Sequence, residues 1–337
     1  MIFSIKAEEK QYPVVVGAGA IGEAGKHFCL GRRVLVVTDS GVPSEYAETV
    51  RRQADEGYLY TLPEGEENKD LTHFQEILVF LMKHGFTRKD AVVSVGGGVA
   101  GDLAAFAASC YMRGIDFYNV PTTLAAQADA SVGGKTAADL QGVKNVIGTF
   151  WQPRGVLVDP DTLKTLPKRQ LRAGLAEAVK HGLISDEGLF SLIEQSEDLW
   201  KDLPEIIERS LLVKKCVIEA DPREEGLRKC LNFGHTLGHG LESAGRGSLL
   251  HGEAVALGMI PMCAPEVRKR LLHVLRKYAL PVDTDLDPED CMRFIRHDKK
   301  KQEHGYTAVF VEKTGSYAFQ EMEEEDLLKA LQEIRRP

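Results

Sequence analysis

The sequence predicts an N-terminal α/β domain followed by a mainly α-helical C-terminal domain. Two observations lead to this fold class. Short runs rich in β-branched residues alternate with helical patterns up to about residue 160, and beyond that point strand signals almost vanish. Strands that read as continuous apolar runs and alternate with helices are typical of a parallel sheet covered on both faces. We therefore expect two domains, covering residues 1–160 and 161–337.

Six short runs are expected to form the strands of the N-terminal sheet, which we interpret as part of a nucleotide-binding α/β domain. They cover residues 12–17, 33–39, 58–62, 91–98, 117–121 and 155–160. In the C-terminal half, segments such as LRAGLAEAVKHGLI and EDLLKALQEIRR show 3.6-residue periodicity. A late strand pair is expected at 307–312 and 316–320, joined by a Lys-Thr-Gly turn.

Composition and charge exclude several classes of protein. The chain has 337 residues, 43% of them hydrophobic and 27% charged, which is ordinary for a globular protein with two cores. Its formal charge of -8 argues against general affinity for nucleic acid or anionic membranes. No apolar run approaches the roughly 20 residues that span a bilayer, and the first residues lack the apolar stretch of a signal peptide. We expect a cytoplasmic protein with six reduced, structural cysteines.

Two glycine-rich turns are candidates for binding a dinucleotide. Residues 17–22 read GAGAIG after a strand, and Asp39 follows as a candidate ribose acceptor. Glycines are also common in plain strand-to-helix turns, so this pattern alone is a weak indication of a pyrophosphate site. Residues 96–98 are three glycines at the end of an apolar strand, with Asp102 in the helical pattern that follows. Because their backbone can approach a diphosphate at a helix N-terminus, this second turn is the better cofactor site.

Histidines and carboxylates in the C-terminal half suggest a metal site. His235 and His239 are four residues apart, so both imidazoles share one helical face and could hold a metal. The glycines around them each cost roughly 1 kcal/mol in a helix interior, which close approach by another helix or a ligand would explain. His251 offers a third imidazole, and Glu177 and Lys180 share a face of another helix. Mixed oxygen and nitrogen donors suit catalytic zinc.

Basic residues lie near these glycine- and histidine-rich segments in the sequence. Each could be a solvated surface charge, but together they suggest an anion pocket. They are Arg113, Lys135, Lys144, Lys180, Lys214, Arg228 and Lys299.

Nine blocks of the chain closely resemble the 3-dehydroquinate synthase family. In the family's order, across about residues 63–300, they are PEGEENKDL, SVGGGVAGD, YMRG, VPTTLAAQADASVGGKT, GVKNVIGTFWQP, LKTLPKRQLRAGLAEAVKHG, ADPREEGLRKCLNFGHTLGHGLE, LHGEAVALGM and HDKK. Such a series is far more specific than a single glycine motif. The resemblance implies a Rossmann-like N-terminal domain, a helical C-terminal domain and an active site in the cleft between them.

The resemblance implies NAD and a divalent metal, zinc or cobalt, as cofactors. The implied metal ligands are Glu177, His235 and His251. The implied NAD contacts are Asp39, Glu66, Lys69, Gly97, Gly98, Asp102, Thr122, Thr123, Lys135, Lys144 and Thr165. The implied lining of the substrate pocket is Arg113, Asp129, Lys135, Asn145, Lys180, Lys214, Arg228, Asn232, His239 and Lys299. His239 is thereby assigned to the substrate, whereas spacing alone favoured it as a metal ligand.

The family's reaction, a step of the shikimate pathway, converts 3-deoxy-D-arabino-heptulosonate 7-phosphate into 3-dehydroquinate and phosphate. NAD oxidises the C5 hydroxyl transiently, phosphate is eliminated, the ketone is reduced again, and an intramolecular aldol reaction closes the ring. The metal would polarise the C5 oxygen, and Lys180 would tune the proton lost from that hydroxyl. Arg228 suits the substrate carboxylate, and Arg113, His239 and Lys299 suit the phosphate. The family also implies a homodimer, with Arg113 a candidate to act across the interface.

The chain departs from the family pattern at two places. Between Met259 and Leu280 there is room for about one helix, where the family usually has two. The segment GKTAADLQGVKN lacks the Asn and Pro commonly seen after the GGKT block. Neither departure removes a residue of the implied site.

Three other functions compete with this interpretation. One is another sugar-phosphate cyclase, such as 2-deoxy-scyllo-inosose synthase, whose substrate has no carboxylate. The second is an NAD- and metal-dependent polyol dehydrogenase, which would release NADH. The third is a non-catalytic binding protein, which would be expected to have lost a metal ligand or the glycine triplet.

Overall fold

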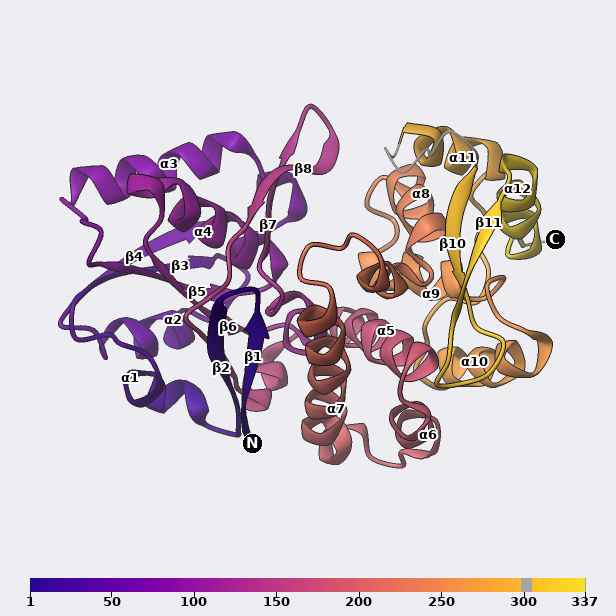
Figure 1. Ribbon diagram of the computed structural model, residues 1–337, viewed down its shortest axis with the longest axis horizontal. Helices are drawn as coiled ribbons and strands as arrows, with labels where there is room; N and C mark the ends of the chain where they lie inside the picture. Colours follow the sequence, from indigo (N-terminus) through magenta and orange to yellow (C-terminus); the bar gives the residue numbers. More distant parts are fainter. Residues whose placement is uncertain (298–304, 337) are drawn as a thin grey trace. The chain divides into compact units, whose positions relative to one another are not determined.

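The chain divides into two compact units in the computed structural model, which describes residues 1–297 and 305–336. The first unit comprises Met1–Pro167 with Lys214–Arg223, and the second comprises Lys168–Val213 with Glu224–Pro337 (Figure 1). The first unit therefore continues past the expected boundary at residue 160 and takes in a later segment of the chain. Lys299, an expected substrate residue, lies outside the described residues.

A seven-stranded sheet forms the centre of the first unit, with strand order β1-β2-β9-β6-β5-β3-β4. Neighbouring strands are parallel except for β1 and β2, which are antiparallel. The strands are β1 (Ile2–Ala7), β2 (Lys10–Val16), β3 (Arg33–Asp39), β4 (Glu56–Leu62), β5 (Ala91–Gly96), β6 (Asp116–Pro121) and β9 (Gly155–Val158). The six expected strands are all present, whereas β1 was not expected.

Strand β3 illustrates why a continuous apolar run suits a sheet covered on both faces. Leu35 and Val37 belong to a buried core with helices α3 and α4, whereas Val34 and Val36 belong to a second core with α1 and α2. Successive side chains of a strand point to opposite faces, so every second residue enters each core. The helices are α1 (Ala24–His27), α2 (Ser44–Arg51), α3 (Leu71–Lys83) and α4 (Gly98–Cys110).

A separate antiparallel hairpin in the first unit consists of β7 (Lys135–Leu140) and β8 (Val143–Phe150), which the sequence patterns did not predict. The Thr136 hydroxyl donates to the carbonyl of Thr149 at 2.9 Å across the pair. The N–H of Asp139 donates to the carbonyl of Lys69 at 2.7 Å, which joins the hairpin to the segment before α3. The contact between Asp139 and Lys69 joins residues far apart in the sequence.

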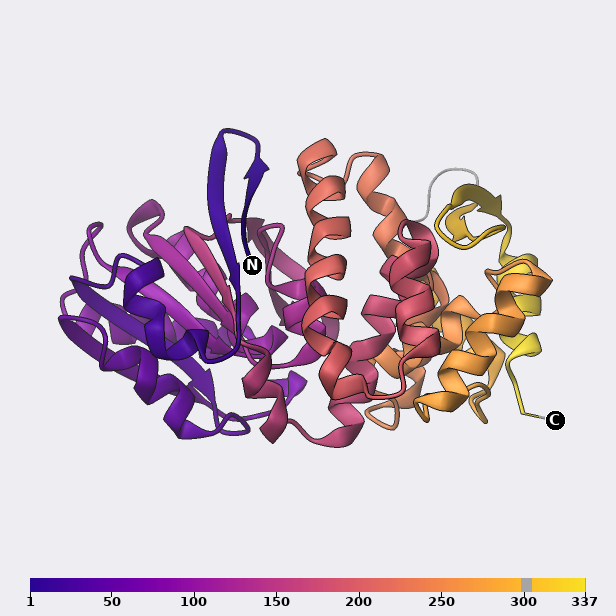
Figure 2. The ribbon, with the colours of Figure 1, turned by 90° about the horizontal axis from the view of Figure 1, so that it is seen from below.

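The second unit is mainly helical (Figure 2). Its elements are α5 (Lys168–Ile184), α6 (Glu187–Gln195), most of α7 (Leu199–Ala220), α8 (His235–Gly245), α9 (His251–Met259), α10 (Pro265–Lys277), α11 (Pro288–His297), β10 (Tyr306–Phe310), β11 (Ala318–Met322) and α12 (Glu324–Glu333). The expected late strand pair is present as β10 and β11. One helix, α10, occupies the short stretch between Met259 and Leu280, as expected.

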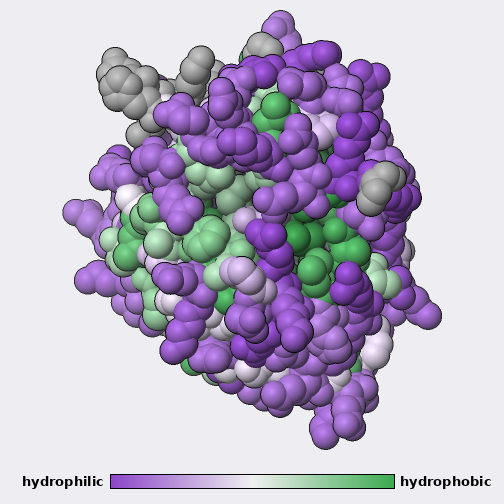
Figure 3. Space-filling view, turned by 90° about the vertical axis from the view of Figure 1, so that its right-hand side faces the viewer, coloured by the Kyte–Doolittle hydropathy of each residue, from purple (hydrophilic) through white to green (hydrophobic). Residues whose placement is uncertain are grey.

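Hydrophilic side chains cover most of the face seen in Figure 3, and apolar side chains gather near its middle. This distribution agrees with a chain in which 27% of residues are charged. Across residues 1–297 and 305–336, no helix combines the length and the apolar character needed to cross a membrane.

Candidate functional site

Three side chains from three helices of the second unit meet at one point. Glu177 comes from the middle of α5, and His235 and His251 are the first residues of α8 and α9. One donor atom of each residue lies within 4.8 Å of the others. Glu177 Oε1 is 3.8 Å from His235 Nε2 and 3.3 Å from His251 Nε2. A carboxylate oxygen and two imidazole nitrogens are donors that suit a zinc or cobalt ion.

His239 lies beside this group without belonging to it. Its ring centre is 5.5 Å from that of His235 and 6.1 Å from that of His251. Within the described part of the chain, the donors that share one point are those of Glu177, His235 and His251. The structure therefore brings together residues from three helices, whereas the spacing of His235 and His239 favoured a pair from one helix.

The Glu177 carboxylate faces a lysine on one side and the imidazoles on the other. Lys180 Nζ lies 2.5 Å from Glu177 Oε2, and both side chains are buried. Burial and the charge of Lys180 lower the pKa of His235 well below its usual range, so that its imidazole is neutral. Partial burial also lowers the pKa of His251, but hydrogen bonds to Glu177 and Glu242 outweigh it and raise this pKa to about 10. Without a metal, protonated His251 thus places a positive charge beside Glu177; a bound metal cation would replace the proton on Nε2 and supply that charge instead.

Arg169 on α5 fixes the N-terminus of α9. Its guanidinium donates two hydrogen bonds to Glu253, from Nε to Oε1 at 2.8 Å and from Nη2 to Oε2 at 2.7 Å. Glu253 Oε2 also accepts from the N–H of Leu250 at 2.9 Å, which caps the helix that begins at His251. This two-pronged contact holds the backbone of His251 near α5.

Close helix packing explains the glycines around α8. A Cβ added at Gly234 would lie 2.7 Å from the carbonyl oxygen of Val255, a residue of α9. A Cβ added at Gly238 would lie 3.2 Å from the Cα of the same valine. A Cβ at Gly240 would lie 2.6 Å from Ile295 Cγ1 on α11. The prediction that another helix approaches these glycines is therefore confirmed. The same packing brings the first residues of α8 and α9 together.

The residues expected to contact NAD all lie in the first unit, several of them at the carboxyl ends of its parallel strands. Asp39 ends β3, Gly97 follows β5, and Thr122 follows β6. The N–H of Thr122 donates to the carbonyl of Gly96 at 2.9 Å, so the ends of β5 and β6 are joined. Dinucleotides commonly bind at this edge of an open parallel sheet.

Lys69 links expected cofactor and substrate residues within the first unit. Its buried Nζ lies 2.5 Å from Asp102 Oδ2 on α4 and 2.5 Å from Asn145 Oδ1 on β8. Burial lowers the pKa of Lys69, but the charges of Asp102 and Glu66 outweigh it and raise this pKa. A charged Lys69 therefore joins the hairpin to α4 beside the glycine triplet.

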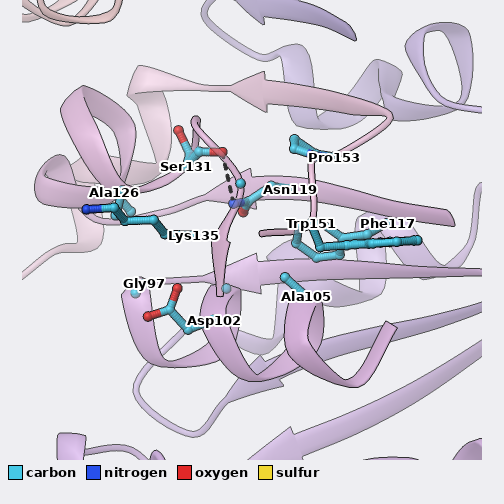
Figure 4. A pocket seen from close by; sticks show the side chains of 14 residues that line it. Gly97, Asp102, Ala105, Phe117, Asn119, Ala126, Ser131, Lys135, Trp151 and Pro153 are labelled. Carbon is cyan, nitrogen blue, oxygen red and sulfur yellow. Dashed lines mark hydrogen bonds between the residues drawn. The ribbon is translucent and has the colours of Figure 1, made fainter. Parts of the chain in front are cut away.

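Two hollows of the first unit contain expected NAD residues. One lies beside the N-terminus of α4 and is lined by Gly97, Gly98, Asp102 and Lys135 (Figure 4). In this hollow Asn119 Nδ2 donates to the carbonyl of Ser131 at 3.4 Å. The other surrounds Asp39 at the end of β3. Burial raises the pKa of the Asp39 carboxyl. Both hollows lie near the ends of parallel strands, where dinucleotides commonly bind.

The other glycine-rich turn, residues 17–22, is already occupied by a side chain of the protein itself. Asp159 accepts hydrogen bonds from the N–H of Gly19 at 3.0 Å and from the N–H of Ile21 at 3.1 Å. The Asp159 carboxylate takes the donors that a diphosphate would need. Of the two interpretations left open by the sequence, the structure favours the plain turn for residues 17–22.

The expected substrate residues come from both units. The first contains Arg113, Asp129, Lys135, Asn145 and Lys214, and the second contains Lys180, Arg228, Asn232 and His239. Lys214 Nζ donates to the Asp129 carboxylate and, at 2.7 Å, to its main-chain oxygen. Arg228 is only 1% exposed. Asn232 Nδ2 donates to Glu224 Oε1 at 2.8 Å. Several of these polar side chains are thus held in place by neighbours.

Sequence reasoning missed Glu242, Arg169, Glu253 and Asp159. Glu253 could have been found from the sequence. Leu250 precedes an apolar helical run, and Glu253 stands three residues later, where a carboxylate commonly caps the start of a helix. Glu242 stands seven residues after His235, two helical turns along the same face. Asp159 carries no local signal, since its partners in residues 17–22 are far away in the sequence.

Fold and donor set together define the chain as an α/β unit with a largely parallel sheet, joined to a helical unit with a candidate metal site. Two solved structures share this organisation closely. A 2-deoxy-scyllo-inosose synthase, crystallised with carbaglucose-6-phosphate, NAD+ and Co2+, has a TM-score of 0.89 and 26% identity, covering 99% of this chain and 100% of its own. The 2-epi-5-epi-valiolone synthase of Streptomyces hygroscopicus, with NAD+ and Zn2+ bound, has a TM-score of 0.89 and 27% identity, covering 98% of each chain. The class is that of the sugar-phosphate cyclases.

Sequence comparison narrows this class to one family. The family model described as "3-dehydroquinate synthase N-terminal" matches residues 59–173, and the one described as "3-dehydroquinate synthase C-terminal" matches residues 174–301. A 3-dehydroquinate synthase of Streptococcus suis is 37% identical, covering 98% of this chain and 100% of the relative. Another, of Streptococcus pneumoniae, is 40% identical, covering 90% of this chain and 92% of the relative. The chain belongs to the 3-dehydroquinate synthase family.

Proposed function

We propose that this protein converts 3-deoxy-D-arabino-heptulosonate 7-phosphate into 3-dehydroquinate and phosphate, using NAD and a divalent zinc or cobalt ion. The observation that carries the proposal is the convergence of Glu177, His235 and His251 from three helices, with donor atoms within 4.8 Å of one another. The family match over residues 59–301 supports the choice of reaction. The expected active site in a cleft between the domains stays a prediction.

The residues present fit both cofactors. Glu177, His235 and His251 would hold the metal, and the strand ends around Asp39 and the glycine triplet would hold NAD. Gly98 is exposed at the N-terminus of α4, a 13-residue helix whose first N–H groups suit a diphosphate. When bound, NAD would supply reversible hydride transfer and the metal would supply Lewis acidity.

The cationic side chains of the protein would handle the acidic substrate. Lys180, buried 2.5 Å from Glu177 Oε2, would place a positive charge where the C5 hydroxyl loses its proton. Arg228 would bind the carboxylate with its planar fork of donors. Arg113, His239 and Lys299 would bind the phosphate that leaves.

A direct assay tests this function. Metal-loaded protein would be incubated with NAD and the heptulosonate phosphate while phosphate and NADH are measured together. We expect phosphate and 3-dehydroquinate to form without net NADH, because the oxidation is reversed within each turnover. Steady accumulation of NADH with a polyol would instead identify a dehydrogenase and contradict the proposal.

A second candidate function is that of 2-deoxy-scyllo-inosose synthase, which the TM-score of 0.89 favours. The buried guanidinium of Arg228 argues for a substrate with a carboxylate. Replacing Arg228 by methionine should therefore raise the KM for the heptulosonate phosphate on the order of 100-fold, the loss expected when a bidentate ion pair is removed. Turnover of a sugar phosphate without a carboxylate that exceeds turnover of the heptulosonate phosphate would support the second candidate.

The ligand assignment has its own test. His251→Ala should lower the bound zinc or cobalt and abolish turnover, while circular dichroism shows an intact fold. His239→Ala should keep the metal, because we assign that side chain to the substrate. Metal loss from the His239 variant but not from the His251 variant would reverse the assignment.

We also propose a cytoplasmic homodimer in which Arg113 acts across the interface. Arg113 is exposed on the surface of the first unit. In a dimer it would reach the substrate bound in the active site of the second subunit. Light scattering on the purified protein would measure the mass. Mixing Arg113→Ala subunits with subunits inactivated at His251 should restore part of the activity if the site is shared.

A further inference from the structure

We propose that Glu242 is a positioning residue for the metal centre, holding the imidazole of His251 so that its Nε2 atom faces Glu177. The inference rests on the proposed function, because it concerns the metal that this function requires. Glu242 Oε2 lies 2.9 Å from His251 Nδ1, and His251 Nε2 lies 3.3 Å from Glu177 Oε1. One imidazole thus bridges two carboxylates from different helices.

The acceptor at each Nδ1 atom determines which ring nitrogen can bind a metal. A carboxylate and a backbone carbonyl accept hydrogen bonds but do not donate them. His235 Nδ1, 3.0 Å from the carbonyl oxygen of Phe233, and His251 Nδ1, beside Glu242, must therefore both carry hydrogen. Both imidazoles then present Nε2 to the metal. Such partners on the far side of a ligand commonly fix its tautomer and orientation.

The two histidines differ in how they are held. The side chain of His235 is only 12% exposed, and its Nδ1 is held by a main-chain oxygen, that of Phe233. The side chain of His251 is 45% exposed, so packing restrains it less. Its orientation therefore depends more on the hydrogen bond that Nδ1 donates to Glu242 on α8. Loss of Glu242 should therefore free the His251 ring to turn.

Helix α8 is built to deliver this carboxylate. Glu242 stands seven residues after His235, so ligand and orienting group share one face of the helix. Gly238 lies between them and brings α8 close to α9, because a Cβ there would lie 3.2 Å from Val255 Cα. The Glu242 side chain is only 13% exposed and therefore has little freedom of its own. The helix thus carries one metal ligand and the group that orients another.

The test measures metal affinity without relying on turnover. Purified full-length protein would be stripped of metal and titrated with Co2+ against a chelator of known affinity, and its cobalt absorption spectrum would be recorded. Glu242→Ala should bind Co2+ on the order of 10–100-fold more weakly than wild type, with altered absorption bands, since that is the usual effect of removing an orienting partner. Glu242→Gln should recover much of the affinity, because the amide oxygen still accepts from Nδ1.

Glu194→Ala is the matched control. The Glu194 side chain is 18% exposed and pairs with Arg270 at 2.6 Å, so this variant also removes a largely buried carboxylate that has a partner. Its cobalt affinity and spectrum should equal those of wild type. Thermal unfolding of each metal-free variant would separate a loss of fold from a loss of metal; should Glu242→Ala unfold, the Gln variant carries the test through its spectrum and affinity.

The outcomes separate the inference from the proposed function. If wild type and Glu242→Ala bind Co2+ equally well with the same spectrum, Glu242 does not position the ligand and the inference fails alone. If wild type does not bind Co2+, the metal of the proposed function fails. If Glu242→Gln behaves like the alanine variant although both are folded, the charge of Glu242 matters instead of its hydrogen bond, and the orientation argument is overturned.

Discussion

Two glycine-rich turns follow strands of the same sheet, and they have different fates. Residues 17–22 follow β2 and residues 96–98 end β5 and begin α4. In the first turn, backbone N–H groups donate to the carboxylate of Asp159. In the second, the exposed Gly98 begins a helix of 13 residues, next to the hollow that contains Asp102 and Lys135. A glycine pattern therefore does not by itself identify a dinucleotide site.

Open space at a single glycine does not separate the two turns. A Cβ added at Gly22 or at Gly98 would find no atom within 4 Å, although one at Gly96 would lie 2.8 Å from the Cβ of Ala100. The first turn leads only into short helical segments, Ala20–Glu23 and Ala24–His27, which leaves it little helix dipole. The partner of the donors and the length of the following helix are decisive. Both depend on residues outside the motif.

The largest expected effect comes from placing a negative charge at each turn. Gly98→Asp should weaken NAD binding on the order of 100-fold or more, because its carboxylate would lie where the diphosphate meets the helix N-terminus. Gly22→Asp is the matched control, since it also adds a carboxylate at an exposed glycine with open space. Its NAD dissociation constant, measured by calorimetry, should match that of wild type. The opposite result would move the cofactor to residues 17–22.

A smaller effect is expected from removing the carboxylate that occupies the first turn. Asp159 is 1% exposed and accepts from Gly19, Ile21 and Asp161. Asp159→Ala should lower the free energy of unfolding by about 2–3 kcal/mol, because buried N–H groups lose a charged acceptor. Urea denaturation would measure the loss, and Asp159→Asn, which keeps one acceptor oxygen, should lose less. NAD affinity of the folded variant should stay unchanged; a large loss would give this turn a cofactor role.

The smallest expected effect concerns the backbone of the first turn. Gly19 has φ of +72°, whereas its added Cβ would meet nothing within 4 Å. Gly19→Ala should therefore destabilise the protein by about 1 kcal/mol, through backbone strain alone. Gly22→Ala, at a glycine outside the left-handed region, should cause no such loss. Equal unfolding midpoints for the two variants would show that the turn relaxes around the new side chain.

The parts of the fold that were predictable are those fixed by local patterns. The buried parallel strands were found because apolar side chains enter a core on each face of the sheet. Strand β1 was missed because it lies at the edge of the sheet and pairs antiparallel with β2. The hairpin β7–β8 was missed because residues far away in the sequence help to hold it. One of them is Lys69, whose Nζ lies 2.5 Å from Asn145 Oδ1.

The candidate metal site shows the limit of spacing arguments. Residues four apart on a helix share a face, and this favoured His235 with His239. The structure joins His235 to Glu177 and His251 because glycines let α8 pack closely against α9, and because Arg169 anchors the start of α9. Only the family resemblance pointed to this trio from the sequence. Glu242, which contacts His251, lay within the resembling blocks and was still overlooked.

The segment Lys214–Arg223 has a consequence for how the protein is made. It follows part of the second unit in the chain but belongs to the first unit, where Lys214 bonds to Asp129 and Glu219 accepts from the N–H of Lys6. A ribosome adds residues in order, and domains commonly fold as they emerge. Here the first unit cannot be completed until residue 223 has left the ribosome. A gene fragment ending at residue 167 would therefore encode an unfinished domain.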